Sequence, residues 1–364
     1  MAQVPDITST VRFIAESCDA GRIAEAVAAA RALSQQQPES LQARVVLARM
    51  LFTAGLWQEA WEAYEVRFDL FPEHFIKVMR RGPTGPEPIP FWRDGALPDS
   101  LLIMGEQGLG DTIQFARFLP MLRARGVRLH AVLDARVHKL LAPLMEGIDL
   151  HSAGASGRVL GVKSWLPLLN LPSALGLMPQ DYQGRIPYLA ADSENVARWR
   201  DRIGAQGFRI GIVWQGNPKA PVDRNRSVPL SVFAPIAALP GARLFALQKG
   251  PGEKAAAPFA LDRLGPEMDT GPDWFLDTAA VITALDLVVS VDTAVLHLAG
   301  ALGRPALMLT HGRNADWRWQ MGTDHTIWYP SVRLVRCPDG GADWNAAAAR
   351  AAFLIRSGNL PPAA

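Results

Sequence analysis

The stretch "LLIMGEQGLGDTIQFARF", residues 101–118, gives the strongest indication of how this chain folds. It begins with an apolar run typical of a buried strand, and from Ile113 onward apolar residues recur at helical spacing. The turn between them holds Gly105, Gly108 and Gly110, followed by Asp111. A strand that passes through a glycine-rich turn into a helix is the building unit of parallel α/β sheets. The stretch therefore predicts an α/β fold.

The same alternation continues through two thirds of the chain. Predicted strands cover residues 101–105, 129–134, 208–216, 243–250, 286–291 and 305–310. Predicted helices cover residues 111–124, 135–145, 188–204, 230–240, 275–285, 293–303 and 343–356. Two such sets, joined by the helix at 188–204, predict two doubly wound, Rossmann-like lobes. In such sheets a ligand binds beyond the carboxyl ends of the strands.

The N-terminal part carries an internal repeat. The segments "AGRIAEAVAAARALSQQQPES" (20–40) and "AGLWQEAWEAYEVRFDLFPEH" (54–74) align with an offset of 34 residues, which pairs Gly21 with Gly55. This period is typical of helical hairpins of the tetratricopeptide type. Such a short array is either a cradle for a peptide or protein, or a structural cap on the α/β part.

These patterns divide the chain into five parts. They are a helical repeat region (1–79), a Pro/Gly-rich linker (80–99), an N-terminal lobe (100–190), a C-terminal lobe (205–340), and a C-terminal helix and tail (341–364) expected to pack on the N-terminal lobe.

Composition excludes several classes of protein. The chain has 49% apolar and 20% charged residues and a net charge of +2, which does not favour nucleic acid as a partner. The two cysteines, Cys18 and Cys337, have neither metal-ligand nor disulfide-framework spacing. No secretory signal and no membrane-spanning segment is expected, so we predict a cytoplasmic protein.

The glycine-rich turn is the first candidate site. Its candidate ligand-binding residues are Gln107, Gly108, Gly110 and Gln114. Its candidate catalytic residue is Asp111. Two other interpretations stay open. Asp111 can cap the helix with Gln114 as its capping-box partner. The turn is also a partial dinucleotide fingerprint, with the third glycine missing and Asp134 near the place of a ribose-binding acid.

The second candidate site is "DLVVSVDTAVLHLAGALGRP", residues 286–305. A helix start suits a phosphate, whereas an acid at that place fits a ligand that also offers hydroxyls, such as a sugar. The candidate substrate-binding residues are Asp292, Thr293, Ala294 and His297. The alternative is that Asp292 or Thr293 is a helix cap and that His297 is a packing residue.

Cations at other strand ends would balance a diphosphate. Lys219, Arg224 and Arg226 follow one predicted strand of the C-terminal lobe, and Lys249 follows the next. No Asp-x-Asp pair, metalloprotease motif or phosphate loop with Lys-Ser/Thr occurs, so no metal site is predicted. The aromatic residues Trp317, Trp319, Trp328 and Tyr329 suit either sugar stacking or packing of the last helix on the first lobe.

Taken together, these motifs resemble the bacterial tetratricopeptide-repeat glycosyltransferase-like proteins. Those proteins are akin to the heptosyltransferases (glycosyltransferase family 9) and more distantly to protein O-GlcNAc transferases. The likeness lies in "GEQGLGDTIQFARFLP", "VWQGNPKAPVDRNRSVPL", "LQKG", "SVDTAVLHLAGALGRP" and "DWRW…WYP". It implies the two-lobed GT-B fold, with Asp111 as catalytic base, Asp292 on the donor sugar beside Thr293 and His297, and Lys219, Arg226 and Lys249 on the donor phosphates.

The predicted function is therefore an inverting, metal-independent transfer of a sugar from a nucleotide-sugar to a protein or glycan, with no other cofactor. A protein or peptide acceptor could be held by the repeats. The alternatives are a non-catalytic scaffold with the same fold, a hydride-transferring enzyme, or another nucleotide-sugar enzyme such as an epimerase. The sequence does not give the sugar, the nucleotide base or the acceptor.

Overall fold

The chain forms two compact units, described in a computed structural model. One unit is Met1–Val78 together with Arg313–Thr323, and the other is Met79–Gly312 together with Asp324–Ala364. The structure describes residues 6–70, 79–81, 86–93, 95–152, 162–182, 186–220, 223, 226–271, 274–313 and 315–364. Segment 313–323, predicted as part of the C-terminal lobe, thus belongs to the helical unit.

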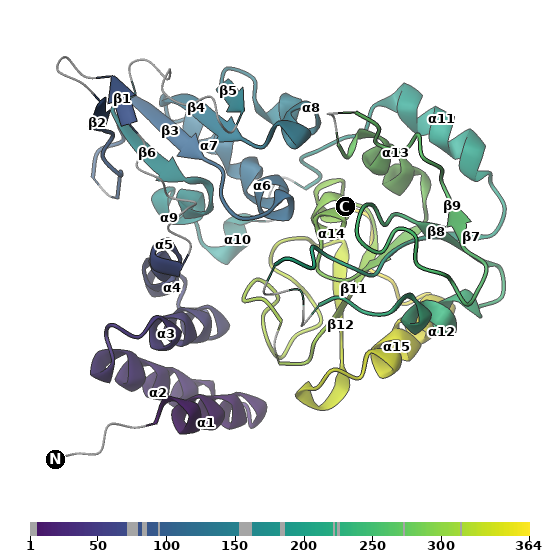
Figure 1. Ribbon diagram of the computed structural model, residues 1–364, viewed down its shortest axis with the longest axis horizontal. Coiled ribbons are helices and arrows are strands. Elements are labelled where there is room, and N and C mark those ends of the chain that lie inside the picture. The colour runs from purple at the N-terminus through teal and green to yellow at the C-terminus, as the bar shows by residue number, and fades with distance from the viewer. Residues whose placement is uncertain are drawn as a thin grey trace. The chain divides into compact units, whose positions relative to one another are not determined.

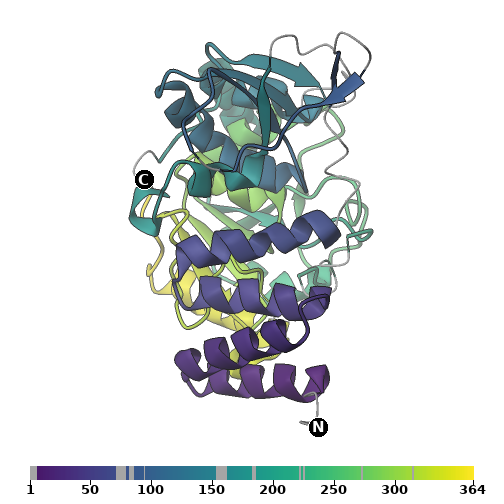
Figure 2. The ribbon, with the colours of Figure 1, turned by 90° about the vertical axis from the view of Figure 1, so that its left-hand side faces the viewer.

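The helical unit is built from successive antiparallel helices. They are α1 (Ile7–Asp19), α2 (Ile23–Gln36), α3 (Leu41–Thr53), α4 (Trp57–Ala63) and, after the short 3-10 turn η1 (Tyr64–Val66), α5 (Arg67–Leu70). Helices α1 to α4 lie side by side in chain order (Figure 2). Gly21 and Gly55 make the turns inside the two hairpins with φ of +71° and +73°, a conformation that favours glycine. The 34-residue spacing therefore marks equivalent turns. The same offset pairs Pro38 with Pro72, and Pro72 lies outside the described residues.

Segment 313–323 completes the core of this unit. The Trp317 ring stacks on Phe52 of α3 with 4.1 Å between ring centroids. The Arg49 guanidinium donates to the carbonyls of Arg313 and Ala315. Because this segment connects two strands of the other unit, the sequence repeat alone could not reveal it.

The first sheet has four parallel strands in the order β5 (Asp149–Ser152), β4 (Arg128–Leu133), β3 (Ser100–Met104) and β6 (Ser164–Pro167). Residues 101–118 form most of β3, the glycine-rich turn and helix α6 (Leu109–Phe115). Helix α6 continues through η3 (Ala116–Phe118) into α7 (Leu119–Arg123). Predicted helix 135–145 is η4 (Ala135–Val137), α8 (His138–Leu141) and η5 (Ala142–Leu144). Figure 1 labels the helices and strands of this lobe, among them α9 (Leu171–Ala174), α10 (Pro179–Tyr182) and the hairpin strands β1 (Met79–Arg81) and β2 (Pro86–Pro88).

The second sheet has six parallel strands. Their order is β12 (Val332–Arg336), β11 (Ala306–Thr310), β10 (Leu287–Ser290), β7 (Phe208–Val213), β8 (Ala242–Ala246) and β9 (Asp262–Arg263). Its helices are α11 (Ser193–Ile203), η8 (Leu230–Phe233), α12 (Ala234–Ala237), α13 (Leu276–Ala284), α14 (Ala294–Ala301) and α15 (Trp344–Arg356), and η9 (Pro338–Gly340) precedes α15. The predicted α/β class with two parallel sheets is confirmed.

Helix α15 covers the second sheet. Its buried residues, Ala347, Ala348 and Ala351, join the same apolar core as Val289 of β10 and Leu307 of β11. The C-terminal residue Ala364 donates its N–H to the carbonyl of Gly303, which also belongs to the second lobe. The predicted packing of 341–364 on the first lobe is therefore wrong, because the alanine face of α15 is used by the nearer sheet. Both cysteines are buried, unbonded thiols, as expected.

Candidate functional site

The glycine-rich turn leads directly into α6, and Asp111 closes it. Gly108 occupies the N-cap position, and Asp111 lies three residues later with its Oδ2 2.8 Å from the Gly108 amide that donates to it. Asp111 therefore supports the helix start from its third position, and the alternative in which Asp111 is the capping residue with Gln114 as its partner is wrong. Gln114 is fully buried inside the lobe, whereas Gln107 is exposed and adopts a left-handed φ of 60°.

Two further acids near this turn have structural partners. The Glu106 carboxylate is buried and accepts the Leu169 amide at 3.1 Å. Asp134 caps a 3-10 turn by accepting the Arg136 amide and also pairs with the Arg136 guanidinium at 2.6 Å. The hydrogen bond from Arg136 lowers the pKa of Asp134. An acid used in this way is a poor candidate for a ribose contact, which weakens the dinucleotide alternative.

The second candidate site lies where β10 passes into α14. Thr293 occupies the N-cap position, and its side chain makes no capping hydrogen bond. The first amides of a helix can bind an anion. One turn later, the buried His297 ring places Nε2 3.8 Å from Oδ1 of Asp292, whose side chain is 18% exposed. Thr293 contacts Ser290 through their hydroxyls, 3.1 Å apart.

The structure brings these two candidate sites together. A Cβ placed on Gly110 would lie 2.8 Å from Cδ2 of His297 and 3.3 Å from Cα of Ala294. Real Cβ atoms do not approach other atoms as closely as 2.8 Å, so only glycine fits here without a shift. Gly110 and Asp111 are neighbours, so the acid of the glycine-rich turn and the Asp292–His297 pair share one region of the molecule.

The predicted phosphate-binding cations are distributed unevenly. Lys249 lines a cavity of about 570 Å³, where its ammonium donates to the Met268 carbonyl at 2.9 Å. Lys219 is exposed, and Arg226 pairs with Asp223 at 3.3 Å. Neither Lys219 nor Arg226 lines this cavity, and Arg224 lies outside the described residues. The structure therefore places one of the three predicted cations in a pocket.

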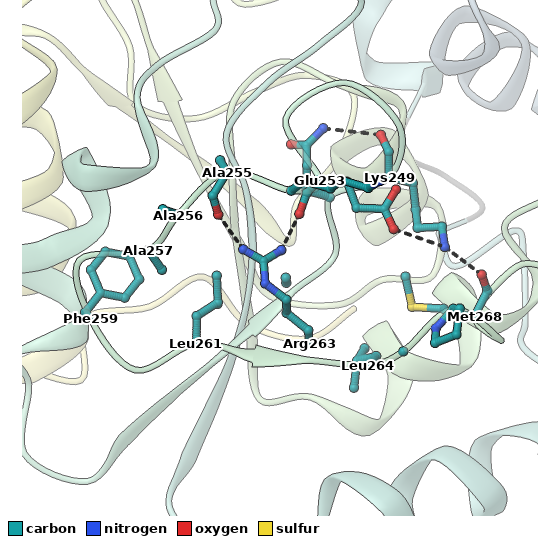
Figure 3. A pocket seen from close by; sticks show the side chains of 15 residues that line it. Lys249, Glu253, Ala255, Ala256, Ala257, Phe259, Leu261, Arg263, Leu264 and Met268 are labelled. Atoms are coloured by element: carbon teal, nitrogen blue, oxygen red, sulfur yellow. Dashed lines mark hydrogen bonds and ion pairs between the residues drawn. The ribbon is translucent and has the colours of Figure 1, made fainter.

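The cavity lies beyond the ends of β8 and β9, where parallel sheets bind ligands. Figure 3 shows an apolar wall that includes Phe259 and Leu261, with Lys249 and Glu253 across from it. Arg263 holds the rim by donating to the carbonyls of Glu253 and Ala255. Sequence reasoning missed this pocket apart from Lys249, because its wall is a loop without a motif.

The aromatic residues after β11 serve packing. Trp317 belongs to the helical unit, and Trp328 stacks on Tyr182 with 4.6 Å between ring centroids. The Tyr329 hydroxyl lies 3.1 Å from Nδ1 of His297. Packing is the interpretation that these ring contacts favour.

The part of the chain that the structure describes contains neither a candidate membrane span nor a candidate metal cluster. None of the helices in that part combines the length and apolarity needed to cross a membrane. Within the same part of the chain, no group of three or more His, Cys, Asp or Glu side chains is arranged to hold a metal ion.

One protein family matches part of the chain. Residues 271–315 match the model of "Glycosyltransferase family 9 (heptosyltransferase)", and this segment contains β10, α14 and the Asp292–His297 pair. The match supports the prediction of a glycosyltransferase.

A relative of known sequence matches almost all of the chain. Protein FlbA of Caulobacter vibrioides is 30% identical over 370 residues, which cover 93% of this chain and 59% of that protein. The chain thus spans somewhat more than half the length of this relative.

Solved structures give more distant likenesses. ADP-heptose lps heptosyltransferase II of E. coli has 14% identity and a TM-score of 0.45, covering 72% of this chain and 100% of that one. E. coli heptosyltransferase WaaC with ADP-2-deoxy-2-fluoro heptose has 14% identity and a TM-score of 0.40, covering 71% and 99%. The dodecameric iron-containing heptosyltransferase TibC, in complex with ADP-D-beta-D-heptose, has 12% identity and a TM-score of 0.42, covering 76% and 80%. TM-scores below 0.5 do not establish the fold or activity of this chain.

Proposed function

We propose that this protein is an inverting glycosyltransferase that takes its sugar from a nucleotide-sugar. The observation that carries the proposal is the contact of Gly110 with His297 and Ala294. It joins the acid-bearing turn of the first lobe to the helix start inside the segment that matches glycosyltransferase family 9. Inverting transfer needs such a meeting, because one group must accept a proton while a diphosphate leaves nearby.

Asp111 is the proposed base. Its Oδ2 accepts the Gly108 amide at 2.8 Å, and this hydrogen bond fixes the orientation of the carboxylate. The base would take the proton of the acceptor hydroxyl as that oxygen attacks the sugar carbon, and the bond to the nucleoside diphosphate breaks on the opposite side.

The second lobe is the proposed donor side. The oxygens of Asp292 and the ring of His297 suit sugar hydroxyls, and the start of α14 suits a phosphate. Lys249, Arg226 and Lys219 are the proposed counter-charges for the diphosphate, so we expect no metal requirement. The 570 Å³ cavity beside Lys249 suits the nucleoside, with the Phe259 wall against the base.

The remaining assignments rest on the same proposal. The two α/β lobes would correspond to a GT-B fold with the acceptor on the first lobe, and the helical unit to tetratricopeptide-like repeats. The Phe52 face of these repeats already holds segment 313–323, which favours a structural role over an open peptide cradle.

A panel of nucleotide-sugars tests the donor. Thermal stabilisation by UDP-, GDP-, ADP- or dTDP-sugars, with slow donor hydrolysis, is the expected result. Stabilisation without any hydrolysis or transfer favours the non-catalytic scaffold. Failure of all four classes to stabilise the protein contradicts a nucleotide-sugar site.

Asp111→Asn tests the base. Asparagine keeps an oxygen that can accept the Gly108 amide, so the helix start stays capped, whereas Asp111→Ala removes the cap as well. We expect Asp111→Asn to lower turnover by roughly 100-fold or more, as loss of a general base does, with nucleotide affinity unchanged. Full activity in Asp111→Asn would show that the carboxylate only caps.

A further inference from the structure

A chain of buried hydroxyl groups connects α6 to His297. The Tyr329 hydroxyl lies 3.1 Å from Nδ1 of His297 and shares a side-chain hydrogen bond with the Tyr188 hydroxyl. Tyr188 in turn lies 3.0 Å from the carbonyl of Ile113 and 3.1 Å from the Arg117 guanidinium. The chain thus begins on the helix that carries Asp111 and ends on the ring beside Asp292.

The direction of each hydrogen bond follows from counting protons. A carbonyl only accepts, so the single proton of Tyr188 goes to Ile113. A guanidinium only donates, so the Tyr188 oxygen accepts from Arg117, and its remaining acceptor position takes the Tyr329 proton. Tyr329 then has no proton left for His297. The contact at 3.1 Å therefore requires that Nδ1 of His297 carries a hydrogen and donates to Tyr329.

The surroundings of Tyr188 and Tyr329 keep both hydroxyl groups protonated and hold Arg117 in place. Burial raises the pKa of both Tyr188 and Tyr329, so both phenols keep their protons. Arg117 is anchored by the carbonyls of Gln114 at 2.8 Å and Trp328 at 3.0 Å, and it lies over the Tyr188 ring at 4.3 Å.

Gly300 of α14 allows the Tyr329 ring to pack where it does. A Cβ on Gly300 would lie 2.4 Å from the Tyr329 ring, so the ring packs directly on the helix backbone. From there its hydroxyl reaches His297 one turn earlier in the same helix.

We propose that Arg117, Tyr188 and Tyr329 are positioning residues that hold His297 in the tautomer protonated at Nδ1. In the neutral ring Nε2 is then an acceptor, and it lies 3.8 Å from an Asp292 oxygen, which also accepts. Two neighbouring acceptors fit a ligand that donates, namely a hydroxyl group. This inference rests on the proposed function and refines it, because it assigns the Asp292–His297 pair to sugar hydroxyls and leaves the phosphates to other residues.

Nitrogen NMR of the full chain tests the tautomer without any substrate. The sequence has seven histidines, and the His297 signals are identified by their loss in His297→Gln. We expect Nδ1 to be protonated and Nε2 unprotonated in the neutral wild-type ring. In Tyr188→Phe the Tyr329 proton is released and turns to His297, so the ring should switch to protonation at Nε2. Tyr64→Phe, in the helical unit, is the matched control and should leave the tautomer unchanged.

The outcomes are distinct. A wild-type ring protonated at Nε2, or a Tyr188→Phe ring that does not switch, overturns the proposal. If Tyr188→Phe does not fold, the wild-type spectrum still decides. With a donor in hand, Tyr188→Phe should weaken nucleotide-sugar binding by about 10-fold, typical of one misdirected hydrogen bond, and leave the sugar-free nucleoside diphosphate unaffected. The expected tautomer in a protein that binds no nucleotide-sugar would refute only the proposed function.

Discussion

Gly110→Ala is the most direct test of the contact between the two lobes. Gly110 lies within the first turn of α6, and its φ is not in the left-handed region. Alanine is therefore compatible with the backbone, and in a helix it normally stabilises by about 0.4–1 kcal/mol. Any loss of stability must come from the neighbours of the new methyl group.

Those neighbours cannot move freely. The methyl would lie 2.8 Å from the His297 ring, which is held at Nδ1 by Tyr329, and 3.3 Å from Cα of Ala294. Overpacking of this kind costs about 1–3 kcal/mol. Set against the helical gain, the net expectation ranges from about zero to a loss of about 2.6 kcal/mol, with a middle value of about 1.3 kcal/mol. A net loss is opposite in sign to the usual effect of this substitution.

Urea unfolding of purified wild-type protein and variants measures the difference. Gly341→Ala is a matched control, because its Cβ would meet only the Pro338 carbonyl at an ordinary 3.5 Å. The control should be neutral or slightly stabilising, and Gly110→Ala should also weaken nucleotide-sugar binding by displacing His297. If Gly110→Ala were as stable as the control, the close contact with His297 and Ala294 would be refuted.

Three further predictions follow from other parts of the molecule. Trp317→Ala removes the ring stacked on Phe52 and should destabilise the helical unit by about 2–4 kcal/mol, seen as an earlier melting of its near-ultraviolet circular dichroism signal. Burial lowers the pKa of the His130 imidazole below 6.5 in the folded protein. As the pH falls, the unfolded chain therefore protonates this side chain before the folded chain does. Stability should therefore decline below pH 6.5 by at most about 1.4 kcal/mol per pH unit, and His130→Gln should flatten this decline while the exposed His325→Gln does not. Lys249→Gln should weaken binding of a nucleoside diphosphate by about 10-fold at low salt and by less at high salt, measured by calorimetry.

The strands that the sequence predicted are those buried on both faces. Strands β3 and β10 are continuous apolar runs inside their sheets, and such runs are recognisable without other information. The strands missed in these two sheets are β5, β6, β9 and β12, and each of them lies at an edge of its sheet. Edge strands mix polar with apolar residues, as "DLHS" and "VRLVR" do, so their pattern resembles that of a loop.

The predicted helices were correct in place but not in regularity. Residues 111–124 break into two short helices and a 3-10 turn, with Pro120 at the start of the second helix. Residues 135–145 form one short helix between two 3-10 turns, and Pro143 lies in the second turn. Proline cannot donate the backbone hydrogen bond that a continuous helix needs. The sequence displayed both prolines, so this detail could have been predicted.

The candidate site shows where a motif stops being informative. The sequence marked Gly108 and Gly110 as candidate ligand contacts, and the structure shows that both, like Gly105, also lie close to protein atoms. A Cβ on Gly105 would lie 3.1 Å from the Val132 carbonyl, one on Gly108 would lie 3.2 Å from the Asp111 carboxylate, and one on Gly110 would meet His297. None of the three has a left-handed φ, whereas Gln107 does. These contacts depend on residues far away in the sequence, which no local pattern contains.

The same observation explains why the turn combines glycines with an acid. Gly108 provides the amide that orients Asp111, and Gly110 lets α6 come against the helix start that carries Asp292 and His297. A residue other than glycine in the left-handed region, as Gln107 is here, destabilises the folded chain by about 1–2 kcal/mol. Such strain persists at sites where the backbone geometry serves a function. If the turn were only a cap, Gln107→Gly would relieve that strain and raise stability without affecting turnover. If the turn orients the base, the same substitution should raise stability and lower turnover, because the carboxylate is held less firmly.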